Sequence, residues 1–459
     1  MTPPWVILLF IFTDKRMIRM TIKKITAVLL AAGLLLSLAS CGGAKTVLLL
    51  DREGNAFAEY DGGLTVYEKQ NAAYARYALT EAAERLAEPK GGDAEKGLAL
   101  LARGGGEIRT AADPALMAAA AETDELYFAD RGVPFALAVT DENARLAAVY
   151  SSSGETEPHY AGSAIKPLSV YAPGVESGVI LWSATQEDSP VKQVTTPAGE
   201  EDWPVNGSGR YSYQQIPAAE ALAQSLNTVA VKWLQRYGVT NAMDFLENSF
   251  GIDVSREREI AAQLSEDEVL ANLALGYLQN GVTVCGMAGY YRVFADEGVY
   301  TPPLSVLSVV SGSGKQLYAA APEPRQVLSP ATAWVMNRML KGVVDHGTGT
   351  AARIEGVDIV GKTGTSDGFY DNWFVGVTPR HTVAVWHGPS PTEGNRAAAA
   401  FNAFFHAAAL PSDDAFTPCE QVTQAVYCAE SGFRAGDNCP DVELGYYPAD
   451  RVPALCPLH

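Results

Sequence analysis

The chain has 459 residues, of which 47% are hydrophobic and 19% are charged. This is the composition of a globular protein long enough for one large domain or two. Its formal net charge is −19, and because nucleic-acid binding depends on a basic face, we expect no nucleic-acid partner.

The N-terminus has the pattern of an export signal. An apolar run over residues 25–40 follows one arginine and two lysines within residues 19–24 and ends in small residues. This pattern predicts that residues 1–40 are a secretory signal peptide. The run leads into Cys41-Gly42 and resembles the lipobox of bacterial lipoproteins, in which the cysteine is lipidated.

We therefore expect an exported chain, anchored through Cys41 to the outer face of the bacterial cytoplasmic membrane. The apolar run of residues 25–40 is shorter than the roughly 20 residues that span a bilayer. An uncleaved transmembrane anchor is therefore the second choice.

Residues 41–104 are predicted to be an N-terminal linker or a small helical region. The segment 71–102 is rich in alanine, glutamate and leucine, with a Pro-Lys-Gly-Gly break at residues 89–92. We therefore expect two helices there. Three consecutive glycines at residues 104–106 indicate a hinge.

The body of the chain, residues 105–410, combines hairpins with helices. Pairs of apolar segments separated by short polar turns predict two β-hairpins, formed by residues 135–139 with 146–150 and by residues 373–377 with 382–386. Apolar residues at helical spacing predict three helices, over residues 218–237, 329–344 and 396–409. Hairpins without regular βαβ units favour an α+β fold with an antiparallel sheet flanked by helices.

Ser163 and Lys166 lie three residues apart, just before an apolar run. If that run is helical, the two side chains share a face, with their Cβ atoms roughly 5–6 Å apart. A neutral lysine amine can take the proton of a serine hydroxyl and turn the serine into a nucleophile. A second S-x-x-K, Ser189 with Lys192, is followed by residues typical of a loop. Other segments must therefore decide between the two copies.

Ser225 and Asn227 fall inside the helix predicted over residues 218–237. Both residue types are mildly disfavoured in helix interiors, because their side chains compete for backbone hydrogen bonds. Their presence indicates a role other than helix formation. Pro173-Gly174, about two turns after Ser163, predicts that the helix of the candidate nucleophile is short or bent.

Lys362, Thr363, Gly364 and Thr365 follow β-branched residues, which predicts a strand. Such a strand would offer a cation, two hydroxyls on one face and an edge that pairs with a peptide, so it suits a ligand with a carboxylate. Gly364 would leave room for the ligand's backbone. Residues 356–363 also match the phosphate-loop pattern of nucleotide-binding proteins, but that pattern needs a glycine loop leading into a helix. We expect a strand and a turn instead.

The C-terminal segment, residues 411–459, holds four cysteines, namely Cys419, Cys428, Cys439 and Cys456. They lack the C-x-x-C spacing of common zinc sites, and the six histidines form no ligand pair. We therefore expect no metal and no organic cofactor. In an exported chain these cysteines are expected to form one or two disulfides, whose pairing the sequence leaves open. Cys285, in the body, is expected to be a buried small residue.

Three motifs follow one another along the chain: S-x-x-K at Ser163, S-x-N at Ser225 and K-T-G-T at Lys362. In this order they resemble the signatures of penicillin-binding proteins and serine β-lactamases. The resemblance is to the transpeptidase domain of class A penicillin-binding proteins and covers about residues 105–459. It implies a β-lactamase-like α+β fold with an α-helical lobe. Further stretches that carry it are residues 106–110, 203–206, 225–230, 343–349, 371–376 and 384–388.

The resemblance also implies a catalytic role for each motif residue. Ser163 would attack the peptide bond between two D-alanines of a peptidoglycan stem peptide. Lys166 would be the general base, with an amine kept neutral by burial and a nearby cation. Ser225 would relay the proton to the leaving amine, and Asn227 would bond the substrate amide.

The same resemblance implies a carboxylate-binding strand and an oxyanion hole. Lys362, Thr363 and Thr365 would hold the terminal carboxylate of the stem peptide. The backbone N–H groups of Ser163 and Thr365 would form the oxyanion hole, which stabilises the negative charge that develops on the attacked carbonyl.

These roles imply a D,D-transpeptidase that binds peptidoglycan stem peptides and is acylated by β-lactams. A D,D-carboxypeptidase or a β-lactamase would use the same residues, and a non-catalytic β-lactam-sensing protein is the third reading. Class A proteins carry a glycosyltransferase domain, for which residues 42–104 are too short. We therefore expect no glycan polymerisation by this chain, and a glycosyltransferase would be a separate partner.

Overall fold

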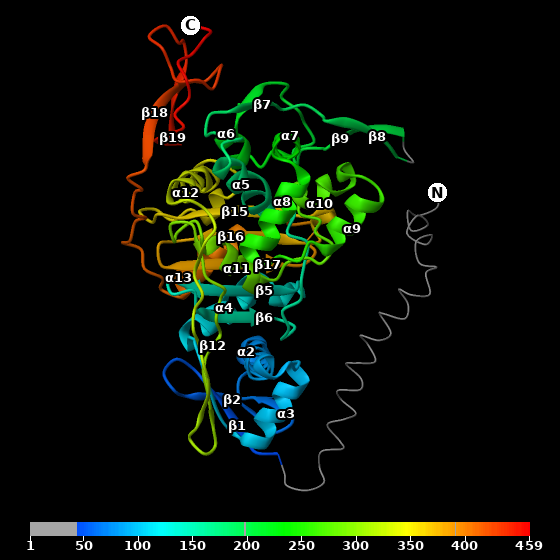
Figure 1. Ribbon diagram of the computed structural model, residues 1–459, viewed down its shortest axis with the longest axis vertical. Coiled ribbons are helices and arrows are strands. Elements are labelled where there is room, and N and C mark those ends of the chain that lie inside the picture. Colours follow the sequence, from blue (N-terminus) through cyan, green and yellow to red (C-terminus); the bar gives the residue numbers. More distant parts are fainter. Residues whose placement is uncertain (1–43, 197–198, 391) are drawn as a thin grey trace.

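The computed structural model describes residues 44–459 except 197–198 and 391, and it is an α+β structure (Figure 1). The predicted signal peptide and the lipidation site Cys41 lie outside the described residues, so both stay predictions. Within the described part of the chain, no helix is both long enough and apolar enough to cross a membrane.

The central layer is a five-stranded antiparallel sheet in the order β15-β16-β17-β5-β6. Its strands are β5 (Phe135–Asp141), β6 (Leu146–Ser151), β15 (Val360–Thr365), β16 (Asn372–Val377) and β17 (His381–His387). Both predicted hairpins are confirmed, and they are neighbours in one sheet. The strand that carries Lys362, β15, lies at the edge of this sheet.

Helices cover both faces of this sheet. On one face, Phe374 packs against Phe401 of α13 (Ala397–Ala407), with ring centroids 5.1 Å apart, and α13 packs beside α4 (Pro114–Tyr127). On the other face, the Thr140 hydroxyl donates to the Ala288 carbonyl of α11 (Val284–Arg292) at 2.9 Å. Because successive side chains of a strand alternate between faces, this helix cover explains why both sides of the sheet are apolar.

A helical lobe lies between the sheet and the C-terminal tail (Figure 1). Its helices are α5 (Ala172–Glu176), α6 (Ala218–Ala223), α7 (Asn227–Tyr237), α8 (Val239–Phe245), α9 (Ser255–Gln263), α10 (Leu270–Leu275) and α12 (Pro330–Asp345). The helices predicted over residues 329–344 and 396–409 are confirmed as α12 and α13.

The segment that carries Ser163 is an irregular helix. A 3-10 turn, Gly162–Ile165, is followed by a π-helical turn, Pro167–Tyr171, and then by α5. Pro173 follows the π-helical turn closely, and as a proline it has no N–H to continue the helical hydrogen bonds. The helix ends at Glu176, so it is short, as the Pro-Gly pair predicted.

The prediction of one continuous helix over residues 218–237 is wrong. The chain forms α6 and α7 with a corner between them, where Ser225 takes a left-handed backbone conformation with a φ of 57°. The Leu226 N–H donates to the Ala221 carbonyl at 2.9 Å and closes the end of α6. Apolar spacing did not reveal the corner, because each half keeps helical periodicity by itself.

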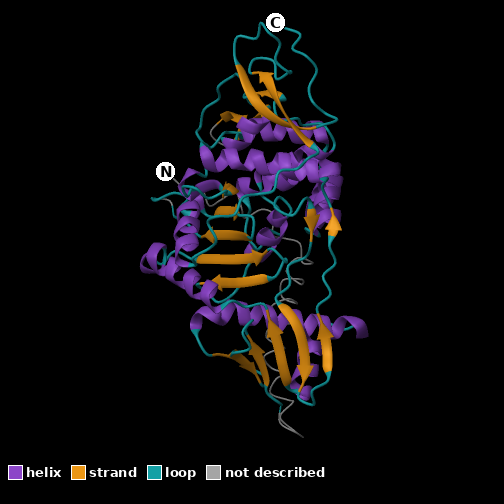
Figure 2. Cartoon of the chain, turned by 90° about the vertical axis from the view of Figure 1, so that its left-hand side faces the viewer, coloured by secondary structure: helices purple, strands orange, loops and turns teal. Residues whose placement is uncertain are grey.

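A second sheet lies at the far end of the molecule from the tail (Figure 2). It has six strands in the order β13-β12-β4-β1-β2-β3, and α2 packs on it with α3 alongside. These elements are β1 (Val47–Leu50), β2 (Ala56–Tyr60), β3 (Leu64–Val66), β4 (Gly106–Thr110), β12 (Val306–Ser311), β13 (Gln316–Ala319), α2 (Ala72–Ala87) and α3 (Ala94–Gly104). The two helices predicted within residues 71–102 are thus confirmed.

The boundary that we placed at residue 104 falls inside this second sheet, because β1 pairs with β4 in parallel. Residues 44–104 therefore contribute strands as well as helices. Gly106, expected to belong to a hinge, begins β4. A Cβ added there would lie 2.0 Å from the Val310 carbonyl oxygen, so the glycine permits close approach of neighbouring strands.

The C-terminal tail is an antiparallel ribbon of β18 (Val422–Cys428) and β19 (Val442–Pro448), at the top of Figure 1. Arg451 Nη1, just after the ribbon, donates to the carbonyls of Val175 and Glu176 at 2.9 and 2.7 Å. The tail therefore contacts the last turn of the helix that follows Ser163. Three smaller strand pairs complete the fold, namely β7 (Thr185–Glu187) with β10 (Gln215–Pro217), β8 (Lys192–Thr196) with β9 (Gly199–Trp203), and β11 (Val299–Tyr300) with β14 (Arg325–Gln326).

Candidate active site

Three segments that are far apart in the sequence meet beside β15. Lys166 comes from the irregular helix of Ser163, Ser225 and Asn227 come from the corner between α6 and α7, and Lys362 comes from β15. Lys166 Nζ donates to Asn227 Oδ1 at 2.7 Å and to the Ser225 carbonyl at 2.8 Å. Lys362 Nζ donates to Ser225 Oγ at 2.9 Å. Residues from all three predicted motifs thus form one hydrogen-bonded group.

Ser163 is the residue of its segment that reaches open space. All other residues from 161 to 175 are buried, whereas Ser163 is partly exposed. The buried Tyr291 steadies this segment by donating its hydroxyl to the Ala164 carbonyl. A serine that is accessible on a rigid support has the placement that an attacking hydroxyl requires.

Lys166 is fully buried. Burial, together with the nearby amine of Lys362, holds the pKa of the Lys166 amine well below its usual range. The lowering has the two causes that the sequence predicted. A lysine with a lowered pKa can accept a proton from a hydroxyl, and its contacts with Ser225 and Asn227 hold the amine in one place.

The hydroxyl of Ser225 lies between the two amines. Its Oγ is 3.4 Å from Lys166 Nζ and 2.9 Å from Lys362 Nζ. Because a hydroxyl both donates and accepts hydrogen bonds, it can pass a proton between its neighbours. Ser225 holds this place only by adopting a left-handed backbone conformation, which costs a residue with a side chain about 1–2 kcal/mol.

Lys362 is also fully buried, and burial lowers the pKa of its amine to about 7. The amine donates to the Thr363 carbonyl at 2.9 Å. Thr363 Oγ1 lies 2.6 Å from Thr348 Oγ1, which orients the Thr363 hydroxyl. The charge of Lys362 therefore changes near neutral pH, and an anion bound beside it would favour the charged form.

Two glycines let the serine segment touch β15 through the backbone. A Cβ added at Gly364 would lie 2.3 Å from the Ala161 carbonyl oxygen, and one added at Gly162 would lie 2.6 Å from the Thr365 nitrogen. We expected Gly364 to leave room for a ligand, but its missing side chain makes room for the serine segment. The contact brings the Thr365 backbone beside Ser163, and the oxyanion hole that we predicted from their N–H groups stays a prediction.

A buried polar network supports Asn227, and its members, Asn206, Asp188 and Thr228, lie outside the three sequence motifs. The Asn227 N–H donates to Asn206 Oδ1 at 2.8 Å, and Asn206 Nδ2 donates to Asp188 Oδ1 at 2.6 Å. The Thr228 hydroxyl donates to the same carboxylate oxygen at 2.6 Å. These bonds fix the first turn of α7. Asn206 stood in a stretch that carried the family resemblance, whereas no sequence signal marked Asp188.

Asn395 also supports the site without a sequence signal. Its Nδ2 donates to the Gly364 carbonyl at 2.7 Å and to Thr365 Oγ1 at 3.0 Å, while its Oδ1 accepts from the Ala397 N–H at 2.9 Å. Asn395 thus joins the end of β15 to the start of α13 and orients the Thr365 hydroxyl.

The four tail cysteines are free thiols, so the structure does not show the disulfides that we expected. Three of them, Cys428, Cys439 and Cys456, gather around His459. Cys419 is not part of this cluster. The expectation of no metal rested on the missing C-x-x-C spacing and overlooked the C-x-x-H spacing of Cys456 and His459. Elsewhere in the chain, the expectation that the body cysteine, residue 285, is buried is confirmed.

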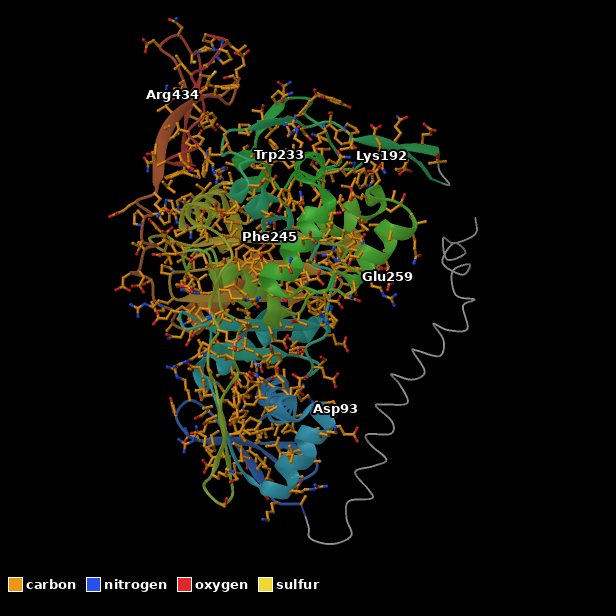
Figure 3. The ribbon with its side chains drawn as sticks, in the orientation of Figure 1. Asp93, Lys192, Trp233, Phe245, Glu259 and Arg434 are labelled. Atoms are coloured by element: carbon orange, nitrogen blue, oxygen red, sulfur yellow. The ribbon has the colours of Figure 1, made fainter. Side chains whose placement is uncertain are left out.

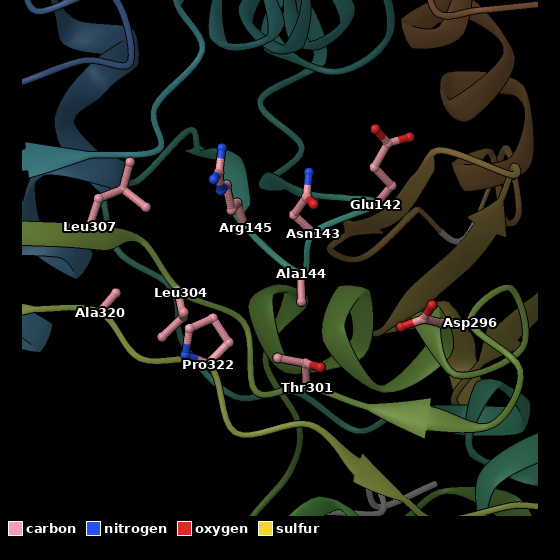
Figure 4. A pocket seen from close by; sticks show the side chains of 10 residues that line it. All are labelled: Glu142, Asn143, Ala144, Arg145, Asp296, Thr301, Leu304, Leu307, Ala320 and Pro322. Atoms are coloured by element: carbon pink, nitrogen blue, oxygen red, sulfur yellow. The ribbon is translucent and has the colours of Figure 1, made fainter.

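Two further features lie apart from the active-site group. Lys192, from the second S-x-x-K, lies on the outlying β8–β9 ribbon, 3.9 Å from Asp267 (Figure 3). A pocket beside the β5–β6 turn is lined by residues that include Glu142, Arg145 and Asp296 (Figure 4). None of the residues that line this pocket belongs to the three candidate motifs of the active site.

Comparison with known proteins identifies relatives in sequence. A family model described as the penicillin binding protein transpeptidase domain matches residues 136–406. Penicillin-binding protein 1A of Clostridium botulinum is 34% identical over 231 residues, which are 50% of this chain and 27% of that protein. Penicillin-binding protein 1F of Bacillus subtilis is 34% identical over 255 residues, 54% of this chain and 33% of that protein. The chain thus matches a third or less of the length of either relative.

Solved structures share the fold. A D,D-transpeptidase domain of a peptidoglycan glycosyltransferase from Eggerthella lenta superposes with a TM-score of 0.57 at 20% identity, covering 80% of this chain and 98% of that domain. The imipenem acyl-enzyme complex of penicillin-binding protein A from M. tuberculosis gives a TM-score of 0.60 at 15% identity, covering 80% and 99%. The predicted α+β fold with a helical lobe is therefore confirmed.

The corner at Ser225 leads to a stability prediction. We expect Ser225→Gly to be more stable than Ser225→Ala by about 1–2 kcal/mol, because only glycine adopts the left-handed conformation without strain. In a continuous helix the order would be reversed by about 1 kcal/mol. Urea unfolding of the two variants measures this difference, and a more stable alanine variant would contradict the left-handed corner.

Proposed function

This chain belongs to the penicillin-binding protein transpeptidase family, and on that premise we propose that it is an acyl-serine D,D-transpeptidase that cross-links peptidoglycan stem peptides. The observation that carries this proposal is the fully buried Lys166 amine, hydrogen-bonded to Ser225 and Asn227, three residues along the chain from the partly exposed Ser163. An activated serine of this kind is what acyl transfer requires.

In the first half of the reaction, Ser163 Oγ attacks the carbonyl between the two D-alanines of a donor stem peptide. Its proton passes to the neutral amine of Lys166. The C–N bond then breaks, and the departing D-alanine takes a proton relayed through Ser225, which contacts both lysine amines. The donor peptide is left as an ester on Ser163, and Asn227 bonds the substrate amide.

The strand β15 supplies recognition in this proposal. Lys362, Thr363 and Thr365 bind the terminal carboxylate of the donor. The donor's backbone lies along the outer edge of β15, on the side where no strand of the described residues pairs with it. The N–H groups of Ser163 and Thr365 stabilise the oxyanion. Loss of one such donor typically costs about 3–4 kcal/mol of transition-state stabilisation.

In the second half, an amine of a neighbouring stem peptide attacks the ester, gives up a proton and releases Ser163 as a free hydroxyl. Water in place of the amine would make the enzyme a D,D-carboxypeptidase, or a β-lactamase when the acyl group comes from a β-lactam. β-Lactams are expected to acylate Ser163, in keeping with the imipenem acyl-enzyme of the structurally similar penicillin-binding protein A. The proposal places the chain on the outer face of the membrane, beside a separate glycosyltransferase.

Covalent labelling tests the assignment of the nucleophile. We expect the parent protein to be labelled by a fluorescent penicillin and Ser163→Ala to remain unlabelled, because the acyl group is transferred to this hydroxyl. Ser189→Ala, from the second S-x-x-K, is the matched control and should be labelled like the parent. An unlabelled parent protein, or labelling of Ser163→Ala, would contradict the assignment of Ser163 as the nucleophile.

Product analysis tests the choice of acceptor. A synthetic stem peptide ending in D-Ala-D-Ala, incubated with increasing concentrations of an acceptor amine, should yield a cross-linked product whose share rises with the amine. Mass spectrometry separates this product from the hydrolysed donor. If only hydrolysed donor forms at saturating amine, the enzyme is a carboxypeptidase, and the acyl-serine chemistry stands without the cross-linking.

The two lysines predict a bell-shaped pH profile for acylation by a β-lactam. The rate should rise with pH as Lys166 loses its proton, since only the neutral amine is a base. It should fall above pH about 7, where Lys362 loses the charge that binds the carboxylate. Stopped-flow acylation rates give the profile. A β-lactam whose carboxylate is esterified is the control. Its acylation rate should still rise with pH but should not fall above pH about 7. The same fall with the ester would exclude Lys362 as its cause.

A further inference from the structure

The tail contains a cluster of side chains that bind metals well. Cys428 ends β18, Cys439 lies in the loop before β19, and Cys456 and His459 follow β19. One ligand atom from each lies within 4.8 Å of the other three. Residues up to 31 positions apart thus converge on one point, which none of the active-site residues shares.

The spacing of the ligand atoms fits a tetrahedral metal site. His459 Nδ1 lies 3.6 Å from Cys428 Sγ and 3.6 Å from Cys456 Sγ. In a tetrahedral zinc site, Zn–S bonds of about 2.3 Å and Zn–N bonds of about 2.0 Å place sulfur and nitrogen roughly 3.5 Å apart. The two sulfur–nitrogen distances thus match those of a zinc site, and the other pairs of ligand atoms lie within 4.8 Å of one another.

The contacts around the cluster also match those of a metal site. Glu430 Oε2 lies 3.3 Å from His459 Nε2, on the side of the ring away from the thiols. A carboxylate in this position fixes the ring so that Nδ1 faces the metal, as is usual for metal-bound histidines. The Gly436 N–H donates to Cys439 Sγ at 3.2 Å, and Ser431 Oγ lies 3.2 Å from Cys456 Sγ. Such contacts stabilise thiolates.

Disulfides account for this arrangement less well. A disulfide would use two of the three clustered thiols and leave the third beside the histidine without a partner. The fourth tail cysteine, Cys419, is outside the cluster. Three thiols and one imidazole instead make a complete Cys3His set, which selects zinc over the oxygen-binding cations magnesium and calcium.

We propose that Cys428, Cys439, Cys456 and His459 bind one structural zinc ion. Four protein ligands close the coordination shell and leave no open position for catalysis. The ion would tie the end of β18 to the segment after β19. The backbone of Arg434, a tail residue labelled in Figure 3, already bridges to Tyr427 of β18 and to Leu455 after β19. The Arg434 N–H donates to the Ala454 carbonyl at 2.9 Å, and its carbonyl accepts from the Cys456 N–H at 2.8 Å.

The site would act on the tail's contact with the helical lobe. The Tyr447 hydroxyl donates to Ser183 Oγ at 2.8 Å, and Ser183 Oγ donates to the Gly432 carbonyl. Gly432 lies between two of the zinc ligands in sequence, Cys428 and Cys439. By fixing this loop, the ion would hold the tail against the lobe whose helix α5 is capped by Arg451.

Metal analysis of the whole chain, purified without chelators, tests the proposal. We expect elemental mass spectrometry to find one zinc ion per chain. When cobalt replaces the zinc, we expect the visible absorption bands of a tetrahedral site with thiolate ligands. Cys439→Ser should lose the zinc, whereas the matched control Cys419→Ser should keep it. Zinc content below one-tenth equivalent in the parent, or equal content in both variants, would overturn the proposal.

A second variant avoids removing a ligand. Glu430→Gln should bind zinc about 10–100-fold more weakly in competition with a chromophoric chelator, because the histidine loses its orienting carboxylate. Unchanged affinity would contradict the assigned position of the ion. The parent is also alkylated before and after a chelator removes the metal, and the modified peptides are identified by mass spectrometry. We expect the three clustered thiols to be alkylated only after the metal has been removed. A disulfide between any two of the three clustered cysteines would overturn the proposal.

Discussion

The candidate active site depends on the burial of two lysine amines around one serine hydroxyl. An ammonium that is taken out of water without a paired anion is strongly destabilised. Lys166 and Lys362 are both fully buried and both contact Ser225 Oγ, so charging both at once is unfavourable. Burial lowers the pKa of each amine, and that of Lys166 also falls because Lys362 is near. The proposed separation into a neutral base and a carboxylate-binding cation follows from this constraint.

The rest of the structure holds the serine segment at both of its ends. At its start, Gly162 and Gly364 allow backbone contact with β15, which any larger residue would prevent. At its end, Arg451 of the tail donates to the last carbonyls of α5. A zinc ion bound in the tail would thus stabilise the far end of the segment that presents Ser163, although it takes no part in the proposed chemistry.

Local patterns in the sequence predicted the residues of the candidate site and part of the secondary structure. Apolar segments around short polar turns indicated β5, β6, β16 and β17, and helical spacing indicated α12 and α13, since both patterns depend on neighbours along the chain. The residue types at Ser163, Lys166 and Lys362 indicated a nucleophile, a base and a cation. Their order carried the resemblance to penicillin-binding proteins, which the matching family model confirms.

Features that depend on contacts between distant segments could not be predicted from local patterns. The left-handed corner at Ser225 lies within a segment of unbroken helical periodicity, and Asp188 reaches Asn206 and Thr228 across a fold that no local pattern encodes. In the tail, the sequence showed four cysteines, and the fold of the β18–β19 ribbon selected three of them and His459 for one cluster. Packing brings these side chains together from distant positions in the sequence, and no local pattern at those positions indicates which residues will be in contact.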